Sequence, residues 1–198
     1  MQLQTALRRR RMVRAYDPDR PVPPDVRDRL LDNAARAPSA GHSQGWAFLV
    51  LEQPAERERF WSALAPGGPP DSWLRGMRTA PLLVVPLAHR AAYLDRYAEP
   101  DKGFPDRDER RWPVPYWYVD TGFATLIMLL TAVDAELGAC FFGIPGDRTA
   151  AFHEAFGVPL SHTAIGVVSV GYPAEGGAVG SAARGRRDLS EIVHRGHW

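Results

Sequence analysis

The stretch that decides the fold is VDTGFATLIMLLTAVDAEL, residues 119–137, in which charged residues stand only near the two ends. It predicts a helix whose apolar residues lie on every side. Such a helix has to be buried all round, and a single chain of 198 residues has little other structure with which to bury it. We therefore expect a second copy of the chain to cover part of this helix.

Short apolar runs and helical patterns alternate on both sides of that helix. Runs bounded by turn residues predict strands at 46–51, 81–87, 138–144 and 164–172, the first two of them buried on both faces. Pro86 marks the end or an edge of its strand, because proline donates no ladder hydrogen bond. Helical spacing predicts helices at 2–10, 54–64 and 146–156, and another that starts near Asp25 and ends before Pro38. The chain has no repeats and no domain boundary, so we expect one domain.

Residues 89–118 break this order. They are polar, aromatic and rich in proline, with no clean period. About thirty irregular residues are unusual in a compact domain unless they form a lid or a binding loop. The aromatic side chains suit a pocket for flat substrates, and they equally suit packing of the lid onto the body or a dimer contact. The candidates for a substrate pocket are Tyr93, Tyr97, Trp112, Tyr116 and Trp117, with Phe104 and Tyr118 nearby in the same segment.

Charge and composition exclude several classes of protein. The 24 basic and 23 acidic residues leave a net charge of +1, which gives no electrostatic case for a nucleic-acid partner. The longest uncharged apolar run, between Asp120 and Asp134, is shorter than the roughly 17 residues of a membrane span. One cysteine, Cys140, excludes an internal disulfide and a cysteine-based zinc site, and we expect no metal. At the N-terminus charge follows a short apolar stretch, the reverse of a signal peptide, so we expect a cytoplasmic protein.

Four short motifs carry candidate binding groups, and each also has an ordinary explanation when taken alone. The arginines of RRMVR, residues 10–14, suit a phosphate grip or a solvated basic face. The small residues of APSAGHSQGW, residues 37–46, let backbone groups approach a flat heterocycle, or simply connect a helix to a strand. The turn FGIPGD (142–147) and the basic tail RGRR (184–187) are typical of a chain reversal and a disordered end.

Taken together, in their order and spacing, these motifs resemble the FMN-dependent nitroreductase family. RRMVRAYD, APSAGHSQGW, the apolar helix, GIPGD, VVSVGYP and an Arg-x-Arg ahead of LSEIV follow one another over nearly the whole chain. The resemblance implies an α+β fold with a mixed central sheet flanked by helices, and an intertwined homodimer with two FMN sites at its interface. It also implies one domain over 1–198, with 89–118 as a variable substrate lid and 173–198 as an arm that wraps the partner.

The resemblance also implies where the phosphate end of FMN binds. Arg10 and Arg11 would approach the phosphate and the ribityl chain, and Arg184 and Arg186 would complete the phosphate clamp. Arg14 would lie near the N1 and O2 edge of the ring, where a positive charge favours the anionic reduced form. None of these positions follows from the spacing alone.

The remaining implied contacts surround the flavin ring. Pro38, Ser39 and Ala40 would line it from the partner subunit, with Ile144, Pro145 and Gly146 over it. Because Pro145 has no N–H, a backbone donor to flavin N5 has to come from Gly146. Three positions depart from the common family pattern: Met12 replaces a serine, His42, which still offers a ring nitrogen, replaces an asparagine, and Gly45 replaces a proline.

The implied activity is the transfer of two electrons from NADH or NADPH through FMN to a nitroaromatic, a quinone or a similar small aromatic acceptor. No dinucleotide-binding glycine fingerprint follows a strand, so the nicotinamide donor would bind transiently above the flavin. We name no catalytic side chain, because the flavin carries the chemistry. Alternatives with the same fold store flavin, degrade it, use a deazaflavin or dehydrogenate natural products. The alternative of a different class is a non-enzymatic basic anion-binding protein.

Overall fold

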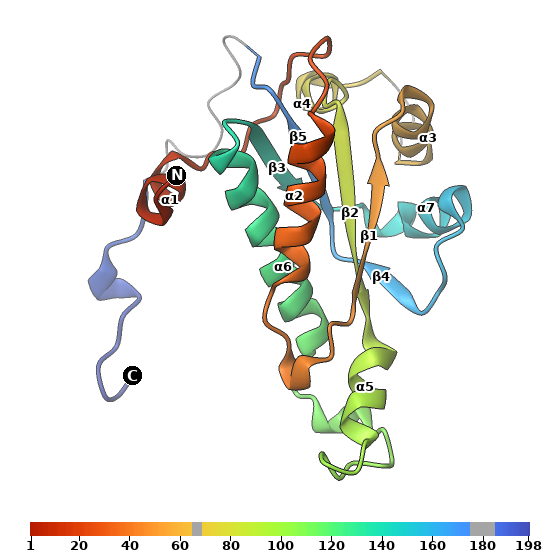
Figure 1. The fold of residues 1–198 in the computed structure, drawn as a ribbon, viewed down its shortest axis with the longest axis vertical. Coiled ribbons are helices and arrows are strands. Elements are labelled where there is room, and N and C mark those ends of the chain that lie inside the picture. Colours follow the sequence, from red (N-terminus) through yellow and green to blue (C-terminus); the bar gives the residue numbers. More distant parts are fainter. Residues whose placement is uncertain (65–68, 175–184) are drawn as a thin grey trace.

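The computed structural model describes residues 1–64, 69–174 and 185–198, and these residues form seven α-helices around a five-stranded sheet (Figure 1). The helices are α1 (Leu3–Arg9), α2 (Pro24–Ala35), α3 (Pro54–Leu64), α4 (Ser72–Met77), α5 (Arg90–Ala98), α6 (Tyr116–Asp134) and α7 (Thr149–Phe156). The strands are β1 (Trp46–Leu51), β2 (Leu82–His89), β3 (Gly138–Phe142), β4 (His162–Ala164) and β5 (Val167–Gly171). Single 3-10 turns lie at Ala40–His42, Glu109–Arg111, Gly146–Arg148 and Leu189–Glu191.

The sheet has the order β1-β2-β5-β3, with β4 beside the second half of β2. All of its strand pairs are antiparallel within the described residues, so the α+β class is confirmed but the mixed sheet is not found there. In the part of the chain that the structure describes, parallel pairing enters only at the bridge between Met12 and Ala139, where the Val13 N–H donates to the Ala139 carbonyl over 3.0 Å. The segment that runs parallel to β3 is too short to form a strand.

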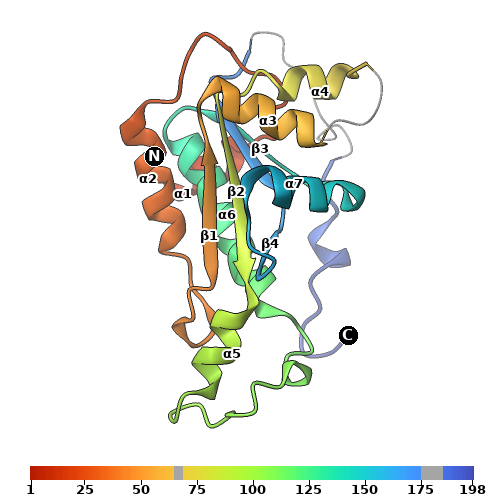
Figure 2. The same cartoon turned by 90° about the vertical axis from the view of Figure 1, so that its right-hand side faces the viewer.

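Two hydrophobic layers cover the two faces of the sheet (Figure 2). One layer is formed by α2 and α6, with Leu30, Met128 and Ala132 in its core. The other is formed by α3, α4 and α7, with Phe60 and Phe152 buried in it. Among the described helices, only α6 is long and apolar enough to cross a membrane, and 56% of its apolar window is buried inside the protein, as in a core helix.

The helix α6 is not buried on every side in the single chain. Phe123 and Leu126 on its outer face are 44% and 46% exposed. On the neighbouring α1, Leu3 and Leu7 are exposed as well. The rest of a single chain therefore covers only part of this helix.

The prediction that Pro86 marks the end or an edge of its strand is wrong, because this residue lies opposite Phe48 inside β2, a strand with neighbours on both sides. On its other side β2 pairs with β5 through residues 82–84 and with β4 through residues 87–89. The Pro86 carbonyl accepts from the Ile165 N–H over 3.1 Å at the break between these two strands. The missing N–H of proline thus falls where the ladder is interrupted. At the same place the strand predicted at 164–172 is divided into β4 and β5.

Two further predictions are corrected. The strand β1 was expected to be buried on both faces, but it is an edge strand and only Leu51 in it is buried. The segment 89–118 was expected to be irregular, yet it contains α5 and the first residues of α6. In the nine residues of α5 only Tyr93 and Leu94 are buried, and two adjacent positions show no helical period.

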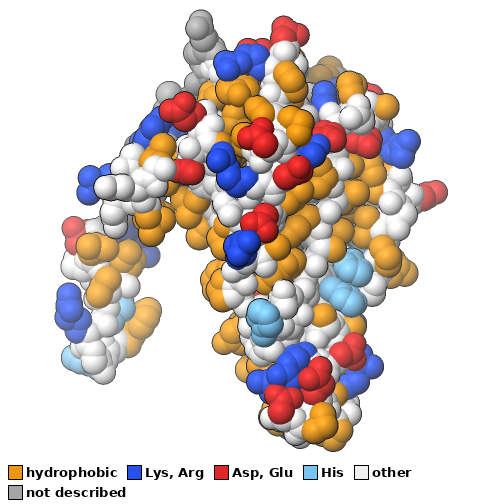
Figure 3. Space-filling model, in the orientation of Figure 1, with side chains coloured by type: hydrophobic (Ala, Val, Ile, Leu, Met, Phe, Trp, Pro, Cys, Tyr) orange, Lys and Arg blue, Asp and Glu red, His pale blue; other side chains and the backbone are white. Residues whose placement is uncertain are grey.

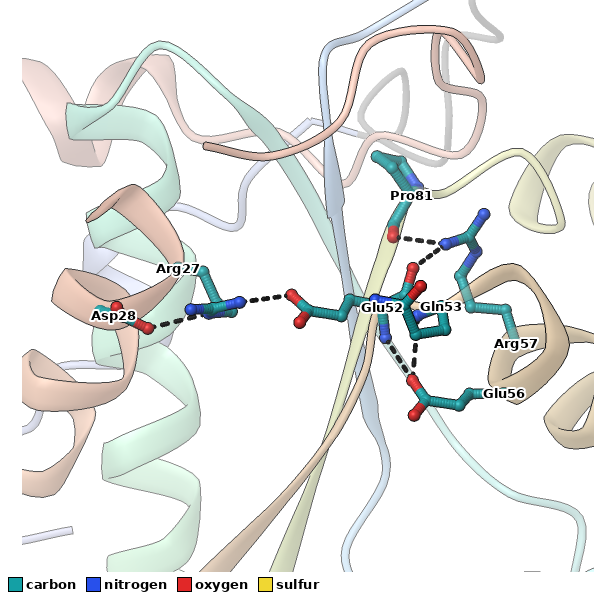
Figure 4. Close-up of polar contacts among 7 residues, drawn as sticks. All are labelled: Arg27, Asp28, Glu52, Gln53, Glu56, Arg57 and Pro81. Atoms are coloured by element: carbon teal, nitrogen blue, oxygen red, sulfur yellow. Dashed lines mark hydrogen bonds and ion pairs between the residues drawn. The ribbon is translucent and has the colours of Figure 1, made fainter. Parts of the chain in front are cut away.

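A polar network connects the turn after β1 to α2 and α3 (Figure 4). Arg27 of α2 pairs with Glu52 at 2.6 Å. The Arg57 guanidinium of α3 donates to the Glu52 carbonyl and, over 2.9 Å, to the Pro81 carbonyl just before β2. The Glu56 carboxylate accepts from the N–H groups of Glu52 and Gln53 and so caps the start of α3.

Candidate functional site

Core contacts hold the N-terminal arginine segment in place. Tyr16 is 1% exposed, and its phenol donates to the Val13 carbonyl over 2.7 Å and lies 2.8 Å from the Ser169 Oγ. Burial raises the pKa of Tyr16, so its hydroxyl keeps its proton. Together with the bridge from Met12 to Ala139, these bonds position residues 10–14 along β3.

The predicted arginines of this segment differ in what they contact. The Nη1 atom of Arg10 is buried and has no hydrogen-bond partner within the described residues. Arg11 is exposed and donates to the carbonyls of Arg8 and Arg10 over 2.6 and 2.9 Å. Arg14 donates to the Met12 carbonyl over 3.3 Å. Its positive charge also opposes the rise that burial causes in the pKa of the Cys140 thiol. A buried guanidinium nitrogen without an acceptor is costly, so Arg10 is the group that an anionic ligand would satisfy.

The turn after β3 borders the same hydrophobic cluster as the arginine segment. Met12 and Ile144 both pack against the cluster that contains Tyr16 and Phe60. Phe142, the last residue of β3, stacks on Trp61 with ring centroids 5.8 Å apart. Beyond it Pro145 and Gly146 are exposed, and a Cβ added at Gly146 would meet nothing within 4 Å. The arginine segment and this turn therefore border one hydrophobic cluster, with open space at the glycine.

The loop before β1 lies elsewhere. It contains the predicted residues Pro38, Ser39, Ala40 and His42, and it adjoins α5 at the opposite end of β1 from α3 and α4 (Figures 1 and 2). Its backbone is strained, with φ of +57° at His42 and +49° at Gln44. The Gln44 N–H donates to the Ser39 Oγ over 3.0 Å. Within one chain this loop does not meet the arginine segment.

Two other elements hold this loop. The Arg96 Nε of α5 donates to the Gly41 carbonyl over 2.9 Å. The Ala40 N–H donates over 2.8 Å to the Oδ2 of Asp120, a residue of α6 that is 2% exposed. The same oxygen accepts from the Tyr93 hydroxyl over 2.9 Å. Asp120 was not predicted as a site residue, although an acidic residue inside an otherwise apolar helix is a signal that could have pointed to it.

The lid aromatics fall into two groups. Tyr97, Trp112 and Tyr116 line a cavity of about 370 Å³, which lies within the size range of ligand pockets. Its other lining residues are Leu94, Phe104, Arg107, Asp108 and Arg111. Tyr93 and Trp117, by contrast, are buried in a cluster with Ala88. Of the predicted pocket residues, therefore, three line a cavity and two are core residues in the single chain.

The C-terminal segment stands apart from the body of the molecule (Figure 3). Arg184 lies outside the described residues, and Arg186 is exposed on the segment 185–198. Apolar residues of this arm are exposed too, namely Leu189, Ile192, Val193 and Trp198.

Comparison with known proteins decides the family. A family model described as "Nitroreductase family" matches residues 7–172. The chain belongs to the nitroreductase family. A relative from Thermus thermophilus named "NADH dehydrogenase" is 29% identical over 192 residues, covering 87% of each chain.

Solved structures show that the fold of this family member is shared. A nitroreductase family protein from Clostridium difficile 630 matches with a TM-score of 0.74 at 20% identity, covering 100% of both chains. An FMN-dependent nitroreductase from Clostridium difficile R20291 matches with a TM-score of 0.71 at 20% identity, covering 99% of this chain and 100% of the other. At this level of identity the likeness concerns the fold alone.

Proposed function

We propose that the protein is an FMN-dependent oxidoreductase that passes two electrons from NADH or NADPH to a flat aromatic acceptor such as a nitroaromatic or a quinone. The observation that carries the proposal is the buried Nη1 atom of Arg10, which has no acceptor among the described residues of this nitroreductase. A phosphate oxygen would satisfy it through a charge-assisted hydrogen bond. The names of the Thermus and Clostridium relatives support the nicotinamide donor and FMN respectively.

We further propose a homodimer in which each flavin lies between two protomers. The arginine segment and the turn 144–146 of one protomer would meet the loop 38–42 of its partner. Within a single chain the arginine segment and the loop 38–42 lie far apart (Figure 1). The exposed Phe123 and Leu126 of α6 and the apolar side chains of the arm support this assembly, because a second copy would remove them from water. The arm would then carry Arg184 and Arg186 to the phosphate bound by Arg10.

The residues present fit FMN in three places. Arg10 would hold the phosphate, and Arg14 would supply positive charge to the N1 and O2 edge of the ring. The Gly146 N–H would offer a donor, and no Cβ blocks its approach to a flat ring. When bound, FMN accepts a hydride from the nicotinamide donor and passes the electrons onward. The cavity lined by Tyr97, Trp112 and Tyr116 would hold the acceptor by aromatic stacking.

The visible spectrum of the purified protein, followed by the mass of the released ligand, tests this proposal. We expect a yellow protein with bound FMN that bleaches on anaerobic addition of NADH or NADPH and regains its colour with a nitroaromatic. A spectrum that stays oxidised would favour flavin storage or degradation, and a deazaflavin would be recognised by its mass. A colourless protein that cannot be reconstituted with FMN would contradict the proposal and favour a basic anion-binding protein.

A further inference from the structure

A buried carboxylate needs a reason, and Asp120 has a specific one. It lies 2% exposed in α6, a helix whose other buried residues include Trp117, Ala124 and Met128. Burial of a carboxylate is costly unless hydrogen bonds compensate for the lost water. Asp120 receives two such bonds on its Oδ2 atom, from the Ala40 N–H at 2.8 Å and the Tyr93 hydroxyl at 2.9 Å. One side chain of α6 thus joins the loop before β1 to α5.

The loop that Asp120 holds is strained and needs support from outside. Gly41, His42 and Gln44 all have positive φ, at +61°, +57° and +49°. A positive φ at a non-glycine residue persists only where the surroundings enforce it. The Ser39 and Ser43 side chains bond within the loop. The bonds that fasten it to the body include those of the Ala40 N–H to Asp120 and of the Arg96 side chain to the Gly41 carbonyl. At the end of the loop the His89 N–H donates to the Gly45 carbonyl over 2.8 Å.

The helix α5 connects the same loop to the lid cavity. Tyr93 and Arg96 contact the loop or its carboxylate anchor, whereas Leu94 and Tyr97 line the cavity. The Tyr97 ring also lies against the loop, because a Cβ added at Gly41 would stand 2.7 Å from its Cε2 atom. Burial, together with the bond to Asp120, raises the pKa of Tyr93, so its hydroxyl remains a donor. A shift of the loop would therefore move the wall of the cavity.

We propose that Asp120 is a positioning residue that holds the flavin-facing loop 39–42 and the acceptor cavity of α5 as one unit through its bonds to Ala40 and Tyr93. This inference rests on the proposed function for the roles of the loop and the cavity. The rigidity of the loop itself does not depend on that function. Asp120 touches neither reacting partner and acts through these two groups.

The test compares Asp120→Ala, Tyr93→Phe and the conservative Asp120→Asn in the full-length protein. Hydrogen–deuterium exchange of residues 38–46 measures the loop directly, without flavin. We expect exchange there to accelerate about tenfold in Asp120→Ala and about threefold in Tyr93→Phe, because one acceptor or one donor is lost. Asp120→Asn retains an acceptor oxygen and should restore most of the protection.

Thr125→Val is the matched control. Thr125 is buried on the same helix, and among the described residues its hydroxyl bonds only to the Thr121 carbonyl, so its loss should lower stability without affecting the loop. In the flavin-loaded enzyme we expect Asp120→Ala to weaken FMN binding about tenfold and to raise the acceptor KM more than it lowers kcat. Combining it with Tyr93→Phe should add little, because both changes break the same link.

The outcomes separate this inference from the proposed function. Unchanged exchange of residues 38–46 in Asp120→Ala, or equal acceleration in Thr125→Val, would overturn the inference even if the protein reduces nitroaromatics. If exchange accelerates in Asp120→Ala but the protein binds no flavin, Asp120 still anchors the loop. That outcome would contradict both its role in aligning flavin and acceptor and the proposed function. If Asp120→Ala does not fold, the comparison of Tyr93→Phe with Thr125→Val decides.

Discussion

The phenol of Tyr16 donates to the carbonyl of Val13, three residues earlier in the chain, over 2.7 Å. This bond holds the extended segment that follows α1 against the core, next to the arginines of residues 10–14. Replacing Tyr16 with Phe should lower the free energy of unfolding by about 1 to 2 kcal/mol, because the Val13 carbonyl and the Ser169 hydroxyl lose a partner. Chemical denaturation measures this, with the exposed Tyr118→Phe as the control. Equal stability of the two variants would show that the bond contributes nothing.

Arg10→Ala tests the buried guanidinium. FMN binding should weaken by roughly 1.5 to 3 kcal/mol, about 10- to 150-fold, because a charge-assisted bond is lost. The stability of the flavin-free protein should not fall, since within the described residues Arg10 Nη1 has no partner to lose. Titration of the apoprotein with FMN measures the affinity. Arg9, the exposed last residue of α1, supplies the control Arg9→Ala, which should leave the affinity nearly unchanged.

The outer face of α6 is expected to form the dimer interface. Leu126→Asp places a charge in the proposed apolar contact and should convert the dimer to monomer, with loss of flavin. Leu160→Asp is the control, because Leu160 is 92% exposed in the loop before β4, far from α6 in sequence. Size-exclusion chromatography with light scattering measures the mass. A dimeric Leu126→Asp protein would move the interface to another face.

The arm provides a separate test of the same assembly. Removing residues 184–198 should cost both the dimer and most of the bound FMN, because the arm is proposed to wrap the partner and to bring Arg184 and Arg186 to the phosphate. Light scattering and the ratio of flavin to protein absorbance report the two losses. A shortened chain that stays dimeric and fully loaded with FMN would refute this placement of the arm.

Stability should depend on pH through a histidine pair. His89 and His162 are cross-strand neighbours whose rings stack with centroids 4.3 Å apart. Burial, and then the neighbouring His89, lower the pKa of His162 below its ordinary value of 6.5. The unfolded chain therefore binds a proton more readily, and the free energy of unfolding should fall as the pH drops below about 6.5. Denaturation at several pH values measures this slope. The variant His162→Gln should flatten it, and an unaltered slope would assign the pH dependence to other groups.

Sequence alone predicts elements whose ends are marked by turn residues. The strand 46–51 and the helix 54–64 coincide with β1 and α3, each bounded by glycine, proline or polar residues. The helix α5 was not predicted, because only the adjacent Tyr93 and Leu94 in it are buried and two adjacent positions show no helical period. The anchor of Ala40 lies 80 residues away at Asp120, a pairing that no local pattern contains. Likewise, the arginine cluster was evident from sequence, but which of its side chains would be buried depends on the packing around Met12 and Val13.

The comparison of FMN with riboflavin tests the central claim most directly. The two ligands share the same ring and differ in the phosphate, the group that Arg10 is proposed to hold. Titration of the apoprotein should show FMN binding at least about tenfold more tightly than riboflavin, and Arg10→Ala should remove most of that preference. Equal affinity for the two ligands, or no binding of either, would contradict the account.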